Sequence, residues 1–301
     1  MLMHAEDTER ARQGEHDFSM ERRLAHLDPA LHRRFTDAVF ALQHNLSNYK
    51  LLFPEYTDHT VLHSLTVIDF CNRLIGDQID ALSADEVYTL LMGCYFHDTG
   101  MGISRRDYEL FSQNLDFGDY FETHSPENYA DVIRDFHHEF SAQFIRKYAE
   151  LFEIPSEEHL RAVIQVSRGH RRTNLRDEED YPIALMLPNG NTICTPYLAA
   201  LIRLADEIDV AAARNPILLY DLEALTDALQ ISENKKLYAV RELTVSDAGF
   251  TLHVDSREES VCEAVEHMAE KMRQTLNQCR GAVNGRTPFT ITQEWVKLVR
   301  E

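Results

Sequence analysis

The stretch LLMGCYFHDTGMG, at residues 90–102, places two side chains that bind metals at the end of an apolar segment. His97 and Asp98 follow two turns of mainly apolar residues and precede a glycine-rich turn. An imidazole or a carboxylate that is buried without a partner is strongly destabilising, so some partner must satisfy both groups. A metal ion suits both at once. The stretch therefore predicts a metal site whose other ligands come from elsewhere in the chain.

Further candidate ligands recur along the sequence, each at or near the apolar face of a different predicted helix. They are His63, His137, His170 and Asp206. Imidazole and carboxylate together suit Mn, Fe, Co, Ni or Zn. Two such ions about 4 Å apart clamp both the entering and the leaving oxygen of a phosphoryl transfer. The sequence therefore predicts a cofactor of one or two divalent transition-metal ions.

Five motifs carry these residues in a fixed order: HSLTVIDF, CYFHDTGMG, HHEFSAQFI, SRGH and LIRLADEID. With this order and these helical settings the chain resembles the HD-domain superfamily of metal-dependent phosphohydrolases, over residues 59–214. The resemblance implies that Asp98 bridges two ions and that it forms the catalytic centre with His97. It further implies two metal sites beside Asp98. His63, His97 and Asp206 complete the first site, and His137 and His170 form the second.

Several of these assignments have alternatives that the sequence leaves open. His59 is one predicted helical turn before His63 and on the same face, and the position in the motif favours His63. His138 is an alternative ligand to His137. His137 is favoured because two small residues follow it at the spacing found in the family. His170 lies at a predicted helix end, where a cationic imidazole would also interact well with the helix dipole.

Candidate substrate contacts flank the predicted ligand helices. His124 is predicted to be a loop residue, a substrate contact or a substitute ligand, and the sequence does not decide between these roles. Four arginines are candidate phosphate-binding residues, although an arginine in so acidic a chain more often forms surface ion pairs. These arginines are Arg168, Arg171, Arg203 and Arg214.

Composition limits the partners of the chain. The 301 residues carry 30 Lys and Arg against 50 Asp and Glu, a formal charge of −20, which disfavours long nucleic acid and anionic membranes. No apolar run reaches the roughly 20 residues of a membrane span, and the charged amino terminus is unlike a signal peptide. We expect a cytoplasmic location and five reduced cysteines, mostly buried.

Helical periodicity dominates the first 215 residues, and helix-start signals divide them. Ser83 and Glu86 have capping-box spacing, and a polar connection is expected from residue 103 to residue 124. The other expected starts are Asp58, Ser125 with Pro126, Pro155 with Ser156, and Thr195 with Pro196, the last opening a helix that stops at Asn215.

The remaining residues alternate like strands. The stretch YPIALMLPNGNTIC predicts a small hairpin, and KLYAVRELTVSD, GFTLHVDS and TPFTITQEWVKLV predict three strands, with a helix from Glu259 to Gly281 before the last. The predicted fold is mainly α: an HD-domain helical bundle with a small α+β (β-β-α-β) carboxyl-terminal domain. The expected divisions are residues 1–50, 51–216 and 217–301.

The predicted function is a metal-dependent phosphohydrolase whose partner is a small phosphorylated substrate, chiefly a nucleotide. The alternative is a non-catalytic HD-domain sensor or adaptor in a signalling or defence system. There is no G-x-S-x-G elbow, which argues against chemistry based on a serine nucleophile. There is also no P-loop. The sequence leaves open the substrate, the metal, the role of the carboxyl-terminal part and whether the chain forms a homo-oligomer.

Overall fold

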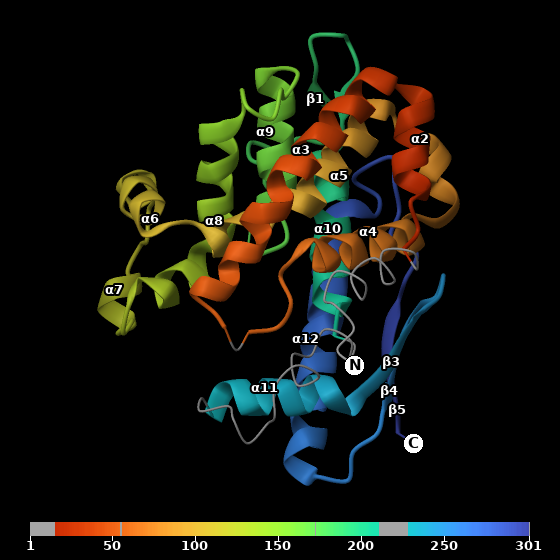
Figure 1. The fold of residues 1–301 in the computed structure, drawn as a ribbon. Coiled ribbons are helices and arrows are strands. Elements are labelled where there is room, and N and C mark those ends of the chain that lie inside the picture. Colours follow the sequence, from red (N-terminus) through yellow and green to blue (C-terminus); the bar gives the residue numbers. More distant parts are fainter. Residues whose placement is uncertain (1–15, 55, 172, 211–227, 301) are drawn as a thin grey trace, which may run out of the picture.

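The computed structural model describes residues 16–54, 56–171, 173–210 and 228–300. The fold is mainly α, as predicted, and the sheets within these residues are small (Figure 1). The α-helices before the carboxyl-terminal part are α2 (Ser19–Leu27), α3 (Pro29–Ser47), α4 (Val61–Ile75), α5 (Ala84–Phe96), α6 (Arg105–Phe111), α7 (Tyr120–Thr123), α8 (Tyr129–Tyr148), α9 (Glu157–Arg168) and α10 (Thr195–Ile208). Short 3-10 helices are η1 (Asn48–Leu51), η2 (Gly76–Ala81), η3 (Thr99–Gly102) and η4 (Ser112–Asn114).

Helix α10 lies at the centre of the bundle and contacts α4, α5, α9 and α12. Every residue from Thr195 to Ala205 is buried, as expected for a helix that is apolar on nearly all sides. Because it touches α4, α5 and α9, which carry or directly precede three of the other candidate ligands, α10 fixes the position of Asp206 relative to them.

The helix starts follow the capping signals of the sequence in part. Ser83 and Glu86 form the predicted capping box of α5, and the side chain of Ser156 caps α9. The prediction for α4 was wrong: Thr60 is its N-cap, while Asp58 Oδ1 accepts a hydrogen bond from the backbone N–H of Thr60.

Three further boundaries differ from the prediction. Helix α8 begins at Tyr129 rather than at Ser125, because Asn128 supplies a capping box with Asp131. The connection from residue 103 to residue 124 is not irregular throughout, since it contains α6, η4 and α7. Helix α10 ends at Ile208, before the expected Asn215, which lies outside the described residues.

The predicted strands form two sheets, but residues 236–239 of the first long stretch belong to a helix, and residues 287–294 of the last stretch are not in the strand. Strands β1 (Leu185–Met186) and β2 (Thr192–Ile193) make the expected hairpin, with Gly190 in the turn at a φ of 87°. After α11 (Ala228–Ala239), β3 (Val240–Val245) pairs antiparallel with β4 (Gly249–Val254). The following helix, α12 (Glu259–Val283), crosses over to β5 (Trp295–Arg300), which pairs parallel with β4. This order is the predicted β-β-α-β arrangement.

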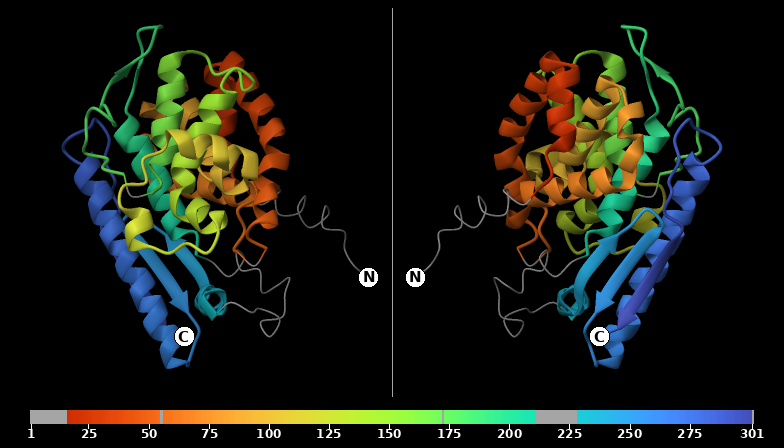
Figure 2. Two further views of the ribbon diagram at one scale, coloured as in Figure 1. Left: turned by 90° about the vertical axis from the view of Figure 1, so that its left-hand side faces the viewer. Right: turned by 90° about the vertical axis from the view of Figure 1, so that its right-hand side faces the viewer.

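Helix α12 joins the carboxyl-terminal part to the bundle. It packs along α10 on one face and contacts β5 on another (Figures 1 and 2). The buried residues of both parts belong to one hydrophobic core, and Tyr197 of α10 stacks on Phe289 with ring centroids 4.3 Å apart. The division of the chain at residue 216 stays a prediction. Among the described residues, no helix is long and apolar enough to cross a membrane.

Candidate metal centre

Six predicted ligands come together where five helices meet. His63 projects from α4, His97 is the C-cap residue of α5 with Asp98 directly after it, and His137 lies on α8. Two more come from α9 and α10: His170 follows the end of α9, and Asp206 lies in the last turn of α10. All are buried except Asp206, which is partly buried. The tertiary fold thus gathers residues that are 143 positions apart at its extremes, from 63 to 206.

Asp98 lies between two groups of ligand candidates, with His63, His97 and Asp206 on one side and His137 and His170 on the other. In the first group, His63 Nε2 lies 3.1 Å from His97 Nε2 and 3.3 Å from Asp206 Oδ1. In the second group, His137 Nε2 lies 2.9 Å from His170 Nε2. Asp98 Oδ2 lies 3.4 Å from His63 Nε2, while its other oxygen, Oδ1, lies 3.5 Å from His137 Nε2. One carboxylate therefore faces both groups, as a bridging ligand must.

Hydrogen bonds fix the tautomers of the four histidines. The Nδ1 atoms of His97, His137 and His170 lie 2.7 to 2.8 Å from backbone carbonyl oxygens, which only accept, so each Nδ1 carries a proton and donates it. The Nδ1 of His63 is 2.7 Å from Asp209 Oδ2. Metal-bound histidines are typically oriented in this way, through the ring nitrogen that does not touch the metal.

The inward Nε2 atoms consequently present lone pairs to one another. Two neutral imidazole nitrogens 2.9 Å apart, as in His137 and His170, have no hydrogen between them and repel each other. A cation held between these nitrogens would replace the repulsion by attraction. The geometry and the nitrogen and oxygen donors fit one or two divalent transition-metal ions.

The pKa values favour the ligand forms of these side chains. Burial lowers the pKa of His137 to about 3 and the pKa of His170 well below its usual value. Burial alone would raise the pKa of Asp98, but the imidazoles of His97 and His59 bring it well below the usual range. At neutral pH His137 and His170 are neutral and Asp98 is ionised, which are the protonation states that metal ligation requires.

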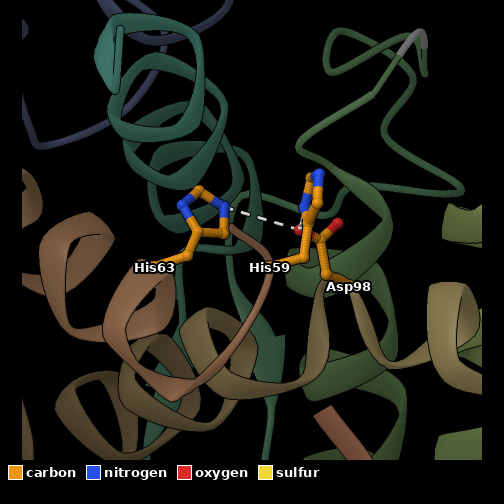
Figure 3. Close-up of side chains that lie close together, drawn as sticks. All are labelled: His59, His63 and Asp98. Carbon is orange, nitrogen blue, oxygen red and sulfur yellow. Dashed lines mark hydrogen bonds and ion pairs between the residues drawn. The ribbon is translucent and has the colours of Figure 1, made fainter. Parts of the chain in front are cut away.

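The structure distinguishes His59 and His138, the two alternatives that the sequence left open. His59 precedes α4 rather than lying within it, and its Nδ1 is 2.7 Å from Asp98 Oδ2. Figure 3 shows His59 and His63 both turned towards Asp98. His59 is thus a further candidate ligand or a hydrogen-bond donor to the carboxylate. His138 belongs to none of the ligand groups found among the described residues, and its Nε2 lies 3.6 Å from Glu139 Oε1.

Close backbone packing holds the two groups against each other. The N–H of Gly100 donates to Ser141 Oγ at 2.8 Å, and this hydroxyl donates to the carbonyl of His97 at 2.7 Å. Only a glycine allows this approach of η3 to α8, because a Cβ at residue 100 would lie 2.1 Å from the carbonyl oxygen of His137. Gly100 and Ser141 therefore fix the distance between Asp98 and His137.

A cleft of about 730 Å³ opens beside the metal-ligand candidates. Its wall includes Asp98 and Asp206 and four basic residues, of which Arg134 and Arg171 belong to the bundle. The other two, Lys236 and Lys271, come from α11 and α12. The cleft is large enough for a small organic ligand, and its basic residues suit an anionic one.

Of the predicted substrate contacts, Arg171 lies in the cleft wall. Arg168 is not among the described residues that line it: its guanidinium pairs with Glu139 at 2.6 Å and with Asp180 at 3.4 Å. Arg214 lies outside the described residues.

Two other predicted contacts have structural partners. Arg203 is buried and donates to the carbonyl oxygens of Gly169 and Thr173, so it holds the turn that carries His170. His124 is exposed and stacks on Tyr120 with ring centroids 4.7 Å apart. Neither is among the described residues that line the cleft, so this placement gives no support to a role in substrate binding.

The helical fold and the shared His/Asp cluster define an HD-type domain with the potential to bind metal. The family comparison agrees: the chain belongs to the HD-CE family, whose model matches residues 53–288. The match extends beyond the bundle and includes α11, α12 and the first two strands of the larger sheet. Neither the curated proteins nor the solved structures gave a significant match.

Sequence reasoning missed four residues of the site. Asp209, the acceptor for His63, had a signal, since it lies three residues after Asp206 in the same motif. Arg134 also had one, because it lies one turn before His137 on α8. Lys236 and Lys271 had none: they come from segments whose position over the cleft depends on how α12 packs against α10.

Proposed function

We propose that this chain is a metal-dependent phosphohydrolase that acts on a small nucleotide or a related phosphoester. The observation that supports the proposal is the arrangement of Asp98, whose two oxygens face separate groups of inward imidazole nitrogens beside a cleft with basic walls. In this proposal His63, His97 and Asp206 hold one metal ion, and His137 and His170 hold a second.

The bound ions would supply Lewis acidity and lower the pKa of water that enters the site. The chain itself would orient the carboxylate of Asp98, since His59 Nδ1 lies within hydrogen-bond distance of Oδ2. Arg171 would hold phosphate oxygens: its side chain forms no ion pair with any residue that the structure describes and lines the cleft directly after His170. Positioned cations of this kind stabilise the charge that develops on a transferring phosphoryl group.

Arg134 has a supporting role in this proposal. Its guanidinium lies between Asp131 and Asp135, with Nε 3.5 Å from Asp135 Oδ1, and its carbonyl oxygen accepts from His137 Nδ1. One residue thus orients a candidate ligand through its backbone and contributes a cation to the cleft through its side chain.

The proposal is tested by metal content and phosphate release. Protein purified without chelator should hold one or two transition-metal ions per chain and release phosphate from nucleotides when Mn, Fe or Co is restored. Asp98→Ala should lose metal and lower turnover by at least about 100-fold, because the shared carboxylate is absent. Asp255→Ala, which removes an exposed carboxylate paired with Arg241, should change neither.

Two results would contradict the proposal. An Asp98→Ala protein that keeps its metal and its activity would remove Asp98 from the centre. A wild-type protein that binds metal but hydrolyses no phosphoester would instead favour the sensor or adaptor alternative.

A further inference from the structure

One face of α12 forms part of the wall of the candidate active site. Ala264, His267, Met268 and Lys271 line the same cleft as Asp98. Their spacing of three, four and seven residues places them on one side of a helix. The carboxyl-terminal part therefore contributes a continuous strip of side chains to a site whose metal-ligand candidates all belong to the bundle.

Lys271 marks the end of this strip near the metal centre. Its Nζ lies 3.0 Å from Glu207 Oε2, and Glu207 directly follows Asp206 in α10. The Lys271 side chain is 62% exposed, whereas that of Glu207 is 15% exposed, so the ammonium group stays accessible from the cleft although it is paired. The pair thus holds a flexible lysine beside the turn of α10 that carries Asp206.

The charge of the cleft wall differs from that of the chain. Acidic residues outnumber basic ones by 50 to 30 overall. The cleft has four basic residues and five carboxylates, and each carboxylate lies within hydrogen-bond or ion-pair distance of a neighbouring side chain. With even one divalent ion bound, the wall carries a net positive charge. Such a wall attracts a polyanion more strongly than a monoanion.

The length of the strip also favours a ligand larger than phosphate. Lys271 and Ala264 are seven residues apart, which is about 10 Å along a helix. Met101, Leu237 and Met268 add apolar surface to the same cleft. An ion-bound phosphate would fill only one end, and the remaining length matches further phosphate groups and a nucleoside.

We propose that Lys271 binds a second phosphate group of the substrate, next to the phosphate that Arg171 holds, so that the chain acts on nucleoside diphosphates or triphosphates in preference to monophosphates. This inference rests on the phosphohydrolase function proposed above. It gives α12 a direct role in substrate selection, in addition to its role in packing against α10.

Binding of non-hydrolysable probes tests the inference without turnover. The affinities of the metal-loaded full chain for methylenediphosphonate and methylphosphonate are measured by calorimetry, and their ratio is the readout. The wild type should prefer the diphosphonate. Lys271→Met should lower this preference about tenfold, as expected for the loss of one charge-assisted contact. Lys271→Arg should restore most of it.

Lys235→Met is the matched control. Lys235 is a partly exposed lysine that pairs with Glu258 at 3.1 Å, and it is not among the described residues that line the cleft. Its replacement should leave the preference unchanged. Equal preference in Lys271→Met and the wild type, in protein of unchanged thermal stability, would overturn the inference, as would a wild type that does not distinguish the probes.

Phosphate release from a nucleoside triphosphate is scored separately from binding. A wild type that prefers the diphosphonate but releases no phosphate would refute the hydrolase while supporting the second-phosphate site. A wild type that hydrolyses phosphoesters without that preference would support the hydrolase and refute the second-phosphate site.

Discussion

Replacement of Gly100 by alanine tests whether close backbone packing sets the geometry of the metal centre. A Cβ at this position would lie 2.1 Å from the carbonyl oxygen of His137 and 2.7 Å from the backbone nitrogen of Ser141. Ordinary contacts of a Cβ begin near 3.4 Å, so η3 and α8 would have to separate by about 1.3 Å along the shorter line. Backbone atoms of a packed helix cannot turn aside as a flexible side chain does.

The shift would act on the metal centre directly. Asp98 immediately precedes η3, and His137 lies on α8, so the distance between Asp98 and the second ligand group would grow. Overpacking of this kind lowers the free energy of unfolding by about 1–3 kcal/mol. Loss of ligand alignment should weaken metal binding about 10- to 100-fold, and a misplacement of about 1 Å should lower turnover roughly 100-fold.

Urea unfolding with and without chelator separates these effects. Gly100→Ala should be less stable than the wild type even without metal and should gain less stability when metal is added. Gly281→Ala is the control, because a Cβ there meets no atom within 4 Å and an alanine favours the helix. If Gly100→Ala keeps wild-type stability, metal content and phosphate release, the close packing of η3 on α8 does not determine the geometry of the metal centre.

Two other perturbations have expected outcomes. Asp209→Ala removes the acceptor for His63 Nδ1 and should weaken metal binding about 10- to 100-fold, measured by competition with a fluorescent chelator; unchanged affinity would mean that His63 needs no such support. The hydrogen bond from His159 holds the pKa of Asp85 below its usual value of 3.8, so the stability that this contact adds is present above pH 3.8 and is lost as the pH falls through the lower folded value. Urea unfolding of metal-free protein between pH 5 and pH 3 should show this loss, and Asp85→Asn should lower stability by about 2 kcal/mol at pH 7 and flatten the pH dependence. If the stability of Asp85→Asn and of the wild type fell equally with falling pH, the pH dependence would belong to other carboxyl groups.

Much of the fold could be predicted from local signals. The capping box at Ser83, the cap at Ser156 and the proline after Thr195 locate three helix starts, because each signal acts on the backbone within one turn. The start of α8 was misplaced, since a proline at residue 126 is compatible with a helix start but Asn128 satisfies the free N–H groups.

The candidate ligands illustrate a different limit of sequence reasoning. Each histidine motif was recognisable, and the described structure brings all six predicted ligands together. Which ring nitrogen faces inward could not be read from the motifs, because it depends on carbonyl groups one turn earlier and on Asp209. The contact between His59 and Asp98 was missed for a similar reason: His59 was expected on α4, but it lies in the segment before it.

The sequence by itself determined the family resemblance, the helical class and the residue types of the metal centre, because these depend on periodicity, caps and motif order within short stretches. Only the tertiary structure decided which basic residues face the cleft. Arg168 and Arg203 were as plausible as Arg171, yet their guanidinium groups satisfy neighbouring carboxylates and carbonyls, while Arg171 lines the cleft. The position of Lys271 depends on the packing of α12 against α10, a long-range contact that no local pattern encodes.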